Sequence, residues 1–367
     1  MIAAVYEGGG QHRPERYVLT GTEPGWVWGA CVEVDGLFRE PRRGTYELFG
    51  WESSGTEVRG WVGCEVWLVP EDSTLDAWLL EDVESLGLHA RTDALVLTGL
   101  DDYLGPPEGH RAQVRLHDGY QWLGSCREFT RVLPDKQAAP PLVLRGLAPS
   151  ERLRRVLAVG TRRALDLDEA WLEIRDDNGD RLTSRLLHPK VGAWHPSAHA
   201  PGLIDLELEL DQEFHEPVPG HARPVMDRWL AGPPTTSGLW AGLDTRQRAL
   251  WLDLVRERGC RFKHQGRPGG AAYELDGRHI TDEASLFLAL GEAVNGPGGY
   301  FGGCVDAVVD CLRGDFGYTA PATLHWRDSA IAHHHLSRVL ASDGAPYDLV
   351  AVMLEILEEG GMSVVFT

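Results

Sequence analysis

The chain contains very little lysine, and its few cysteines are scattered. Only three of its 35 basic residues are lysines, which we attribute to a GC-rich genome rather than to function. Its six cysteines show no Cys-x-x-Cys spacing, which argues against a disulfide framework and favours reduced thiols in the cytoplasm. The chain has no apolar run of about 18 residues, and residues 1–17 lack the apolar core of a signal peptide. We therefore expect a cytoplasmic protein without a membrane-spanning helix.

The chain also has fewer basic than acidic residues. The chain has 55 acidic and 35 basic residues, so its net charge is −20. This balance argues against nucleic acid or an anionic membrane as the main partner and is compatible with a basic protein partner. Residues 271–367 hold 14 acids and 4 arginines, a net charge of 4 − 14 = −10 on about a quarter of the chain. We expect an acidic binding face in this C-terminal region.

No motif of a cofactor-binding or catalytic site stands out. We find no Gly-rich phosphate loop and no nucleophile elbow, and we expect no cofactor and no metal. The three consecutive residues His333, His334 and His335 point in different directions on a helix, so they cannot chelate one metal ion. An enzyme with its site in the N-terminal half remains the least supported of three alternatives.

A repeat extends over the first 220 residues. Trp28-Gly29-Ala30-Cys31-Val32-Glu33 is similar to Leu123-Gly124-Ser125-Cys126-Arg127-Glu128 at an offset of 95, and further short segments match at offsets that grow from 96 to about 109. Loop insertions in one copy would produce such growth. Apolar residues alternate over short runs, as in β-strands. We therefore predict two copies of one β-rich module, at residues 1–110 and 111–222.

Residues 223–270 are predicted to be a linker with one helix, and residues 271–367 a separate α/β domain. The linker is rich in proline and glycine, and Asp244 is expected to cap a helix from Thr245 to Glu257. In the C-terminal region, helical and strand patterns alternate. Strands separated by helices pair in parallel, so we expect a small parallel sheet packed on helices.

The C-terminal region, residues 271–367, resembles a known family. Residues 300–312, Tyr-Phe-Gly-Gly-Cys-Val-Asp-Ala-Val-Val-Asp-Cys-Leu, are similar to the signature of the barstar family, inhibitors of barnase-type ribonucleases. Leu275-Asp276-Gly277, Leu324-His325-Trp326-Arg327 and Glu358-Glu359-Gly360 follow in the family's order. The resemblance covers 271–367 and none of 1–260. It implies a three-stranded parallel sheet with helices, and an antitoxin or immunity protein that inhibits a basic, guanyl-specific ribonuclease.

The resemblance also implies which residues bind the ribonuclease. Asp310 would be the main anchor in the phosphate pocket of the enzyme, with contacts from Asp306, Tyr300 and Gly302 and a peripheral contact from Glu355. The neighbouring Phe301 and Val309 complete this candidate partner-binding set. Here Gly303, Cys304 and Val309 replace polar or bulkier residues that typical members carry, so the partner need not be barnase itself.

The residue pattern is consistent with this expectation on physical grounds. A ribonuclease holds a polyanion in a basic cleft, and Asp306 and Asp310, four residues apart, project from one helix face. An aromatic ring at Tyr300 could cover the cleft, and Gly302 could allow two backbones to approach closely. The main alternative is a non-catalytic scaffold protein that binds its partner through the duplicated β modules.

Overall fold

The computed structural model describes residues 15–55, 58–72, 74–100, 112–132, 141–161, 163, 165–210, 218–261, 266–314 and 316–367. The chain forms two compact units, each discontinuous in sequence. The first unit takes its residues from Met1–Glu40 and Ala138–Pro233, and the second from Pro41–Gln137 and Pro234–Thr367. No helix in the described part of the chain is both long and apolar enough to cross a membrane.

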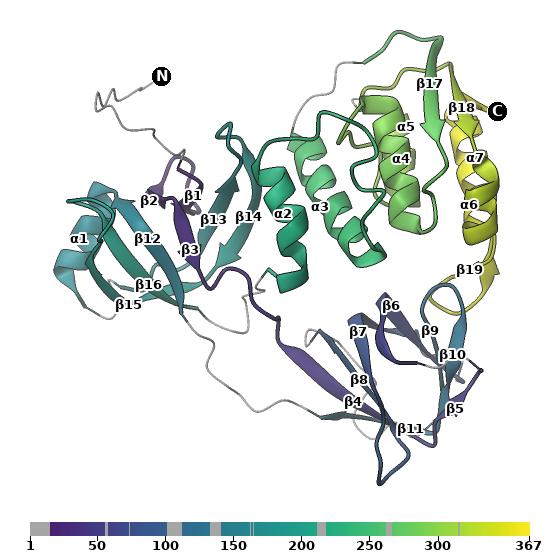
Figure 1. Cartoon of the computed structure of the whole chain (residues 1–367), viewed down its shortest axis with the longest axis horizontal. Helices are drawn as coiled ribbons and strands as arrows, with labels where there is room; N and C mark the ends of the chain where they lie inside the picture. Colours follow the sequence, from purple (N-terminus) through teal and green to yellow (C-terminus); the bar gives the residue numbers. More distant parts are fainter. Residues whose placement is uncertain are drawn as a thin grey trace. The chain divides into compact units, whose positions relative to one another are not determined.

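The first unit is built around an antiparallel β-sheet (Figure 1). Its strands run in the order β14-β13-β1-β2-β12-β16-β15, and β3 also pairs with β12. Its elements are β1 (Tyr17–Gly21), β2 (Val27–Cys31), β3 (Glu33–Asp35), β12 (Leu142–Pro149), α1 (Glu151–Val159), β13 (Ala170–Arg175), β14 (Arg181–Leu187), β15 (Pro189–Pro196), β16 (Ile204–Leu210), the 3-10 helix η1 (Gly220–Ala222) and α2 (Arg223–Leu230). Leu19, Leu144, Leu172 and Leu206 are buried because alternate side chains of a strand point to the same face.

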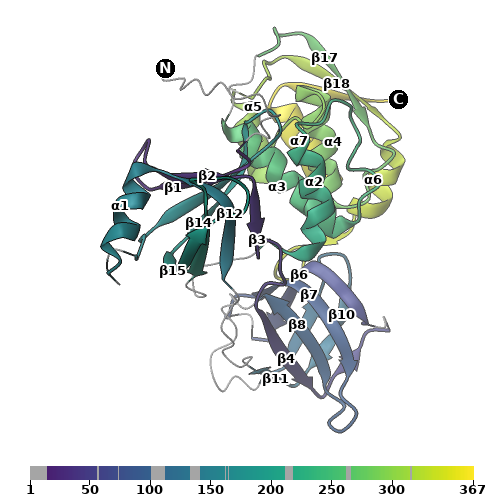
Figure 2. The same ribbon diagram turned by 60° about the vertical axis from the view of Figure 1, so that its left-hand side comes forward.

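The second unit contains a similar antiparallel sheet in the order β11-β4-β8-β7-β6-β9-β10-β5. Its strands are β4 (Arg43–Phe49), β5 (Glu52–Ser53), β6 (Gly60–Pro70), β7 (Trp78–Leu88), β8 (Leu95–Leu100), β9 (Val114–His117), β10 (Trp122–Cys126) and β11 (Glu128–Val132). Tyr46, Leu48, Val66, Leu80 and Leu116 belong to its buried core. Figure 2 shows this sheet with its strands β4, β6, β7, β8, β10 and β11 labelled.

Several ladders of the two sheets have matching registers, although the shift of the β12–β16 ladder between Leu144 and Leu147 has no counterpart in the β4–β8 ladder. Leu19 pairs with Leu172 in the first sheet, and Leu116 pairs with Leu68 in the second. The β1–β2 ladder shifts its register between Leu19 and Thr20, and the β9–β10 ladder shifts between Trp122 and Gly124, which is the matching position. Val34 pairs with Leu144, and Phe129 pairs with Leu48. Each pair therefore combines one of the first three strands of one expected copy with a later strand of the other copy.

The compact units do not coincide with the expected modules 1–110 and 111–222. Strands β1 to β3 pair with β12 and β13, more than 100 residues later, while β9 to β11 pair back onto β4 and β6. The physical reason is that alternation specifies which face of a strand is buried, whereas it does not specify which strand is the partner. Residues 41–137 thus form a sheet inserted between the two segments of the first unit.

The remaining part of the second unit is an α/β domain with a parallel sheet in the order β17-β18-β21. Its elements are α3 (Thr245–Arg261), β17 (Ala271–Asp276), α4 (Glu283–Asn295), α5 (Val305–Leu312), β18 (Ala322–Arg327), α6 (Ser329–Leu336), β19 (Val339–Leu340), β20 (Pro346–Tyr347), α7 (Leu349–Glu359) and β21 (Met362–Phe366). Helix α4 packs on β17, α7 packs on β21 and α5 packs on α7. The expected three-stranded parallel sheet with helices is confirmed.

The expected linker at 223–270 contains two helices instead of one. The expected helix is α3, and the side chain of Asp244 caps it by accepting a hydrogen bond from Gln247 N at 2.8 Å. The additional helix is α2, which buries Val225 and Trp229 in the first unit. Pro224 stands in the first turn of α2. Proline is tolerated there because the N–H groups of the first turn have no intrahelical acceptor. Pro224 therefore marks the start of a helix within the segment that was expected to be a linker.

The β-sheet and the α/β domain of the second unit are joined by buried polar contacts. Asp82 accepts hydrogen bonds from Arg43 Nη1 at 2.8 Å and from Arg246 of α3. Burial opposes ionisation of Asp82, but these hydrogen bonds outweigh it and hold the pKa of the carboxyl below its usual value. Leu340 N donates to Gly119 O at 2.7 Å. Helix α3 is thereby attached to both parts of the unit.

Candidate protein-binding site on helix α5

Helix α5 separates an apolar face from an acidic one. Val308 and Cys311 are buried at 0% and 1% exposure, while Asp306 and Asp310 are exposed. Because four residues span slightly more than one helical turn, both carboxylates leave the helix on the same side. Asp306 lies in the first turn, where the positive end of the helix dipole stabilises its charge. The acidic face expected from the sequence is therefore open to solvent.

The carboxylate of Asp310 is paired with a cation on its own helix. Arg313 Nη1 lies 3.1 Å from Asp310 Oδ1, and the two side chains are 74% and 71% exposed. An exposed pair three residues apart contributes only about 0.3–0.5 kcal/mol, so a partner can displace it. The sequence analysis did not include Arg313, although its i, i+3 spacing from Asp310 indicates the contact.

The loop before α5 is held by side chains of α4. Asn295 Nδ2 donates to the carbonyl oxygens of Tyr300 at 2.6 Å and of Phe316 at 3.0 Å. Glu292 accepts hydrogen bonds from Gly238 N at 2.7 Å and Gly298 N at 3.3 Å. Burial raises the pKa of Glu292, and these two hydrogen bonds oppose that shift. These positioning residues were missed because their role depends on a tertiary contact rather than on a motif.

Gly302 is required by the packing of the domain itself, and its contact with a partner stays a prediction. Its φ of +96° lies in a region that favours glycine. A Cβ on this residue would lie 2.4 Å from Val308 Cγ2 and 2.8 Å from Val308 N. The expected close approach of two backbones thus occurs within the chain, between the loop and the first turns of α5.

Tyr300 and Phe301 do not present their rings to solvent. Tyr300 is 5% exposed and Phe301 is 0% exposed. The Tyr300 ring packs edge-on against Phe316, with centroids 5.8 Å apart, and Phe301 packs in the same way against Tyr318. Burial raises the pKa of the Tyr300 hydroxyl to about 12. The ring therefore belongs to the domain core in the free chain, and a contact of Tyr300 with a partner stays a prediction.

Helix α3 closes the other side of Tyr300. A Cβ on Gly259 would lie 2.3 Å from Tyr300 Cβ, so the helix and the loop are in direct contact. A Cβ on Gly303 would lie 3.9 Å from Leu252 Cγ and 4.0 Å from Arg256 Cδ. The contact of α3 with the loop was not expected, because α3 lies in the segment expected to be a linker.

The two remaining candidate residues lie at the surface of the domain. Val309 is half-buried on α5, between the two aspartates in sequence. Glu355 is exposed on α7, the helix that packs against α5. The structure therefore leaves Asp306, Asp310 and Glu355 accessible, with Val309 partly so.

The described cysteines and histidines do not form a metal site. No group of three or more His, Cys, Asp or Glu side chains close enough to hold an ion occurs among the described residues. Burial raises the pKa of the Cys311 thiol to about 12, which keeps it protonated. Cys260 and Cys304 are exposed free thiols.

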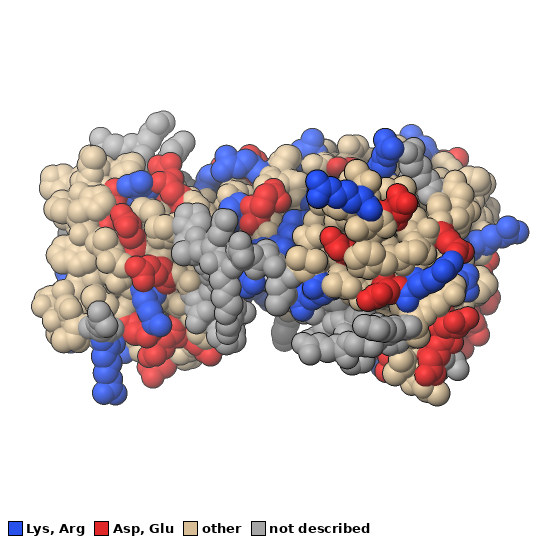
Figure 3. Space-filling model, turned by 90° about the horizontal axis from the view of Figure 1, so that it is seen from below, with Lys and Arg blue, Asp and Glu red and all other residues tan. Residues whose placement is uncertain are grey.

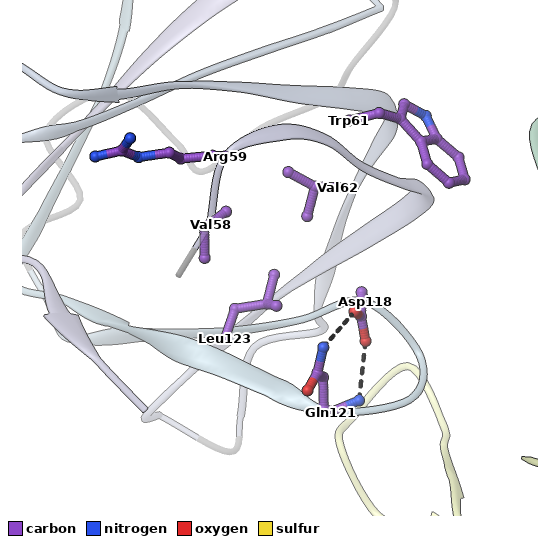
Figure 4. A pocket seen from close by; sticks show the side chains of 7 residues that line it. All are labelled: Val58, Arg59, Trp61, Val62, Asp118, Gln121 and Leu123. Carbon is purple, nitrogen blue, oxygen red and sulfur yellow. Dashed lines mark hydrogen bonds between the residues drawn. The ribbon is translucent and has the colours of Figure 1, made fainter. Parts of the chain in front are cut away.

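A pocket of about 130 Å³ lies in the second unit's β-sheet, apart from α5 (Figure 4). Val58, Val62 and Leu123 line it, and Asp118 and Gln121 stand at its edge. The Gln121 backbone N–H donates to Asp118 Oδ1 at 2.9 Å, so these polar groups already bind each other. A ligand pocket needs convergent polar groups that are free to bind, so this one supports no assignment.

The net charge alone does not locate a binding face. On the face drawn in Figure 3, red acidic side chains are interspersed with blue basic ones. The acidic face of α5 is therefore defined by its particular residues rather than by the overall charge.

The α/β domain presents an exposed acidic helix face, α5, whose opposite face is buried in the domain. Residues 271–358 match the family model described as "Barstar (barnase inhibitor)". The C-terminal region is thus a barstar-family domain, and this family is one of inhibitors. No curated protein and no solved structure matches the chain.

Proposed function

We propose that this chain inhibits a small basic ribonuclease of the barnase type by placing the acidic face of α5 in the enzyme's active cleft. The family match supports this proposal, since it covers the domain that carries α5. The observation that carries the proposal is the exposure of Asp310, 71%, on a helix whose opposite face is buried. A carboxylate held in this way can take the place of an RNA phosphate among the cations of the cleft.

The domain is organised to present this carboxylate without rearrangement. Val308 and Cys311 anchor α5 in the core, and Asn295 fixes the preceding loop. Binding therefore costs little conformational entropy, because only the exposed side chains must be ordered. Acidic charge on the domain also accelerates the encounter with a basic enzyme.

The experiment is a titration of the full chain against barnase and related guanyl-specific ribonucleases, with RNA cleavage as the readout. We expect inhibition, and we expect Asp310→Ala to weaken it by about 2 kcal/mol or more, roughly 30-fold, as for a central interface residue. Glu274→Ala is the matched control. Glu274 is an exposed acid on β17 of the same domain, so its removal changes the net charge equally.

Absence of inhibition at micromolar excess over several such enzymes would refute the proposal for this enzyme class. Equal effects of Asp310→Ala and Glu274→Ala would show that only net charge matters, and that α5 does not enter the cleft.

We also propose that residues 17–210 are an internal duplication whose copies exchange their first three strands. Matching registers in several ladders support this, and so do two glycines at matching positions. A Cβ on Gly29 would lie 2.7 Å from Ala148 O, and a Cβ on Gly124 would lie 2.5 Å from Glu52 O. Gly124 follows Gly29 by 95 residues and Ala148 follows Glu52 by 96 residues, and both values are among the offsets found in the sequence.

A scaffold function of the two β-sheets is the second candidate. A fragment ending at residue 222 is a poor test, because it removes the α/β domain on which residues 41–137 pack. The full chain with Asp310→Ala is the better bait. If it retrieves the same partner as the unchanged chain from the native cell, the sheets and not α5 hold that partner.

A further inference from the structure

Helix α3 lies beside the loop that leads into the acidic helix. Its residue Gly259 touches Tyr300, and its side chains Leu252 and Arg256 lie next to Gly303. Gly303 is separated from Asp306, the first acid of α5, by only two residues. The family match begins at residue 271, so α3, which ends at Arg261, lies outside it.

The position of α3 is fixed independently of the loop. Arg248 Nη1 binds Asp282 Oδ2 at 3.0 Å, and Thr245 Oγ1 donates to the same oxygen at 2.8 Å. Arg246 binds Asp82 of the β-sheet, and Trp251 is buried at 1% exposure. Helix α3 is therefore held in place by contacts that do not involve the loop.

Arg256 is an exposed cation of α3 that lies next to the loop. Its side chain is 57% exposed and its Nη2 lies 2.9 Å from Asp253 Oδ1, three residues earlier on the same helix. An exposed pair of this kind is weak and readily exchanged for another carboxylate. Guanidinium groups favour carboxylates because their paired N–H donors match the two oxygens.

We propose that α3 is part of the surface that receives the ribonuclease, and that Arg256 binds a carboxylate on the rim of the enzyme's cationic cleft. This inference rests on the proposed function. An enzyme that covers α5 from Asp306 to Asp310 must also approach the loop at Gly303, and Arg256 stands there. Since Tyr300 is buried against Gly259, α3 supplies the contact at the loop end of the surface.

The proposal specifies the charge pattern of the partner. The surface carries Asp306 and Asp310 on α5 and Arg256 on α3, and the exposed pairs of Asp310 with Arg313 and of Arg256 with Asp253 can open when a partner binds. The complementary enzyme has a basic cleft with an acidic group on the rim next to it, and an enzyme whose rim is entirely basic is disfavoured.

The test is charge reversal at Arg256 in the full chain, with inhibition measured against the ribonuclease that the unchanged chain inhibits most strongly. Arg256→Glu makes the acidic protein more acidic, so long-range attraction to a basic enzyme alone would tighten binding slightly. A direct contact with a rim carboxylate predicts the opposite, a loss of at least tenfold. Arg256→Gln should give an intermediate loss.

Arg338→Glu is the matched control. Arg338 is exposed and follows α6, which lies on the other side of α4 from α3 in both views (Figure 1, Figure 2). We expect its inhibition constant to stay within twofold or to improve. Thermal unfolding checks that each variant is folded, and neither arginine is buried.

Three results distinguish the two proposals. If Asp310→Ala weakens inhibition and Arg256→Glu does not, α3 is outside the surface and the inhibitor function stands. If Arg256→Glu and Arg338→Glu have the same effect, only net charge is involved and the α3 contact is refuted. If no ribonuclease is inhibited by the unchanged chain, both proposals fail.

Discussion

Arg313 Nη1 donates a hydrogen bond to Asp310 Oδ1 over 3.1 Å, so the main anchor of the proposed inhibitor is already paired with a cation at the end of its own helix. Arg313 directly follows α5, and its positive charge is favourable at the negative end of the helix dipole. The pair therefore stabilises the free helix slightly and competes with the arginines of a partner.

Replacing Arg313 by alanine should strengthen inhibition. The substitution frees Asp310 and removes a cation that repels a basic enzyme, at the loss of an exposed pair worth about 0.3–0.5 kcal/mol. We expect the inhibition constant to fall two- to fivefold at low salt, with less effect at high salt because the repulsion is screened. An inhibition constant that rises instead would show that Arg313 contacts the enzyme.

Replacing Gly302 by alanine should destabilise the α/β domain. The new Cβ would meet Val308 at 2.4 Å and the backbone would remain at a φ of +96°. Backbone strain and overpacking of this kind cost about 1–3 kcal/mol each. Chemical denaturation of the full chain measures the loss, with Gly314→Ala as the control, since Gly314 also has a positive φ but no neighbour within 4 Å. A loss no larger than that of the control would contradict the packing role.

The two matching glycines Gly29 and Gly124 should each destabilise their own sheet when changed to alanine. In both cases the new Cβ would be within 3 Å of a backbone carbonyl oxygen, which costs about 1–3 kcal/mol. Hydrogen exchange should show faster exchange of β1, β2 and β12 for Gly29→Ala, and of β9 and β10 for Gly124→Ala. A change confined to one variant would argue against equivalent positions in the two sheets.

The first unit should lose stability in acid through Asp205. Burial opposes ionisation of this carboxyl, but hydrogen bonds from Ser197, from Gly146 N and from Arg145 hold its pKa at about 2. A lowered pKa in the folded state stabilises the fold above the unfolded value of about 3.9. The contribution is lost as the pH falls from about 4 towards 2.

The variant Asp205→Asn removes this titration. We expect it to be less stable than the unchanged chain at pH 6 and to depend less on pH between 4 and 2. Melting temperatures over this range measure both effects. Parallel curves for the two proteins would exclude Asp205 as a source of the acid sensitivity.

The sequence was sufficient for the C-terminal domain because its motif and its periodicity agree. Alternation of helices and strands predicted the parallel sheet, and the i, i+4 spacing placed Asp306 and Asp310 on one exposed face. The burial of Tyr300 was not predictable in this way. It depends on α3, whose contact with the loop requires a glycine at position 259, and a single glycine in a helix gives no signal for a partner.

The strand partners of the N-terminal half were also beyond prediction from alternation. Leu206 and Leu208 lie on the buried face as expected. Their neighbours in the sheet are set by long-range pairing, in which β1 meets β13 rather than the strands that follow it directly. A repeat predicts equivalent positions, and it does not predict which copy supplies the partner strand.

The insertion of residues 41–137 into the first unit has a consequence for synthesis on the ribosome. The strands β4 to β11 are continuous in sequence, so they can pair with one another once residue 132 has left the exit tunnel, before the α/β domain on which they pack has been made. Strands β1 to β3 emerge first, yet they must wait for β12 and β13 with their edges open to other chains. The nascent protein thus carries unprotected strands until the second half of the unit arrives, which makes pauses in translation before residue 142 a hazard for correct folding.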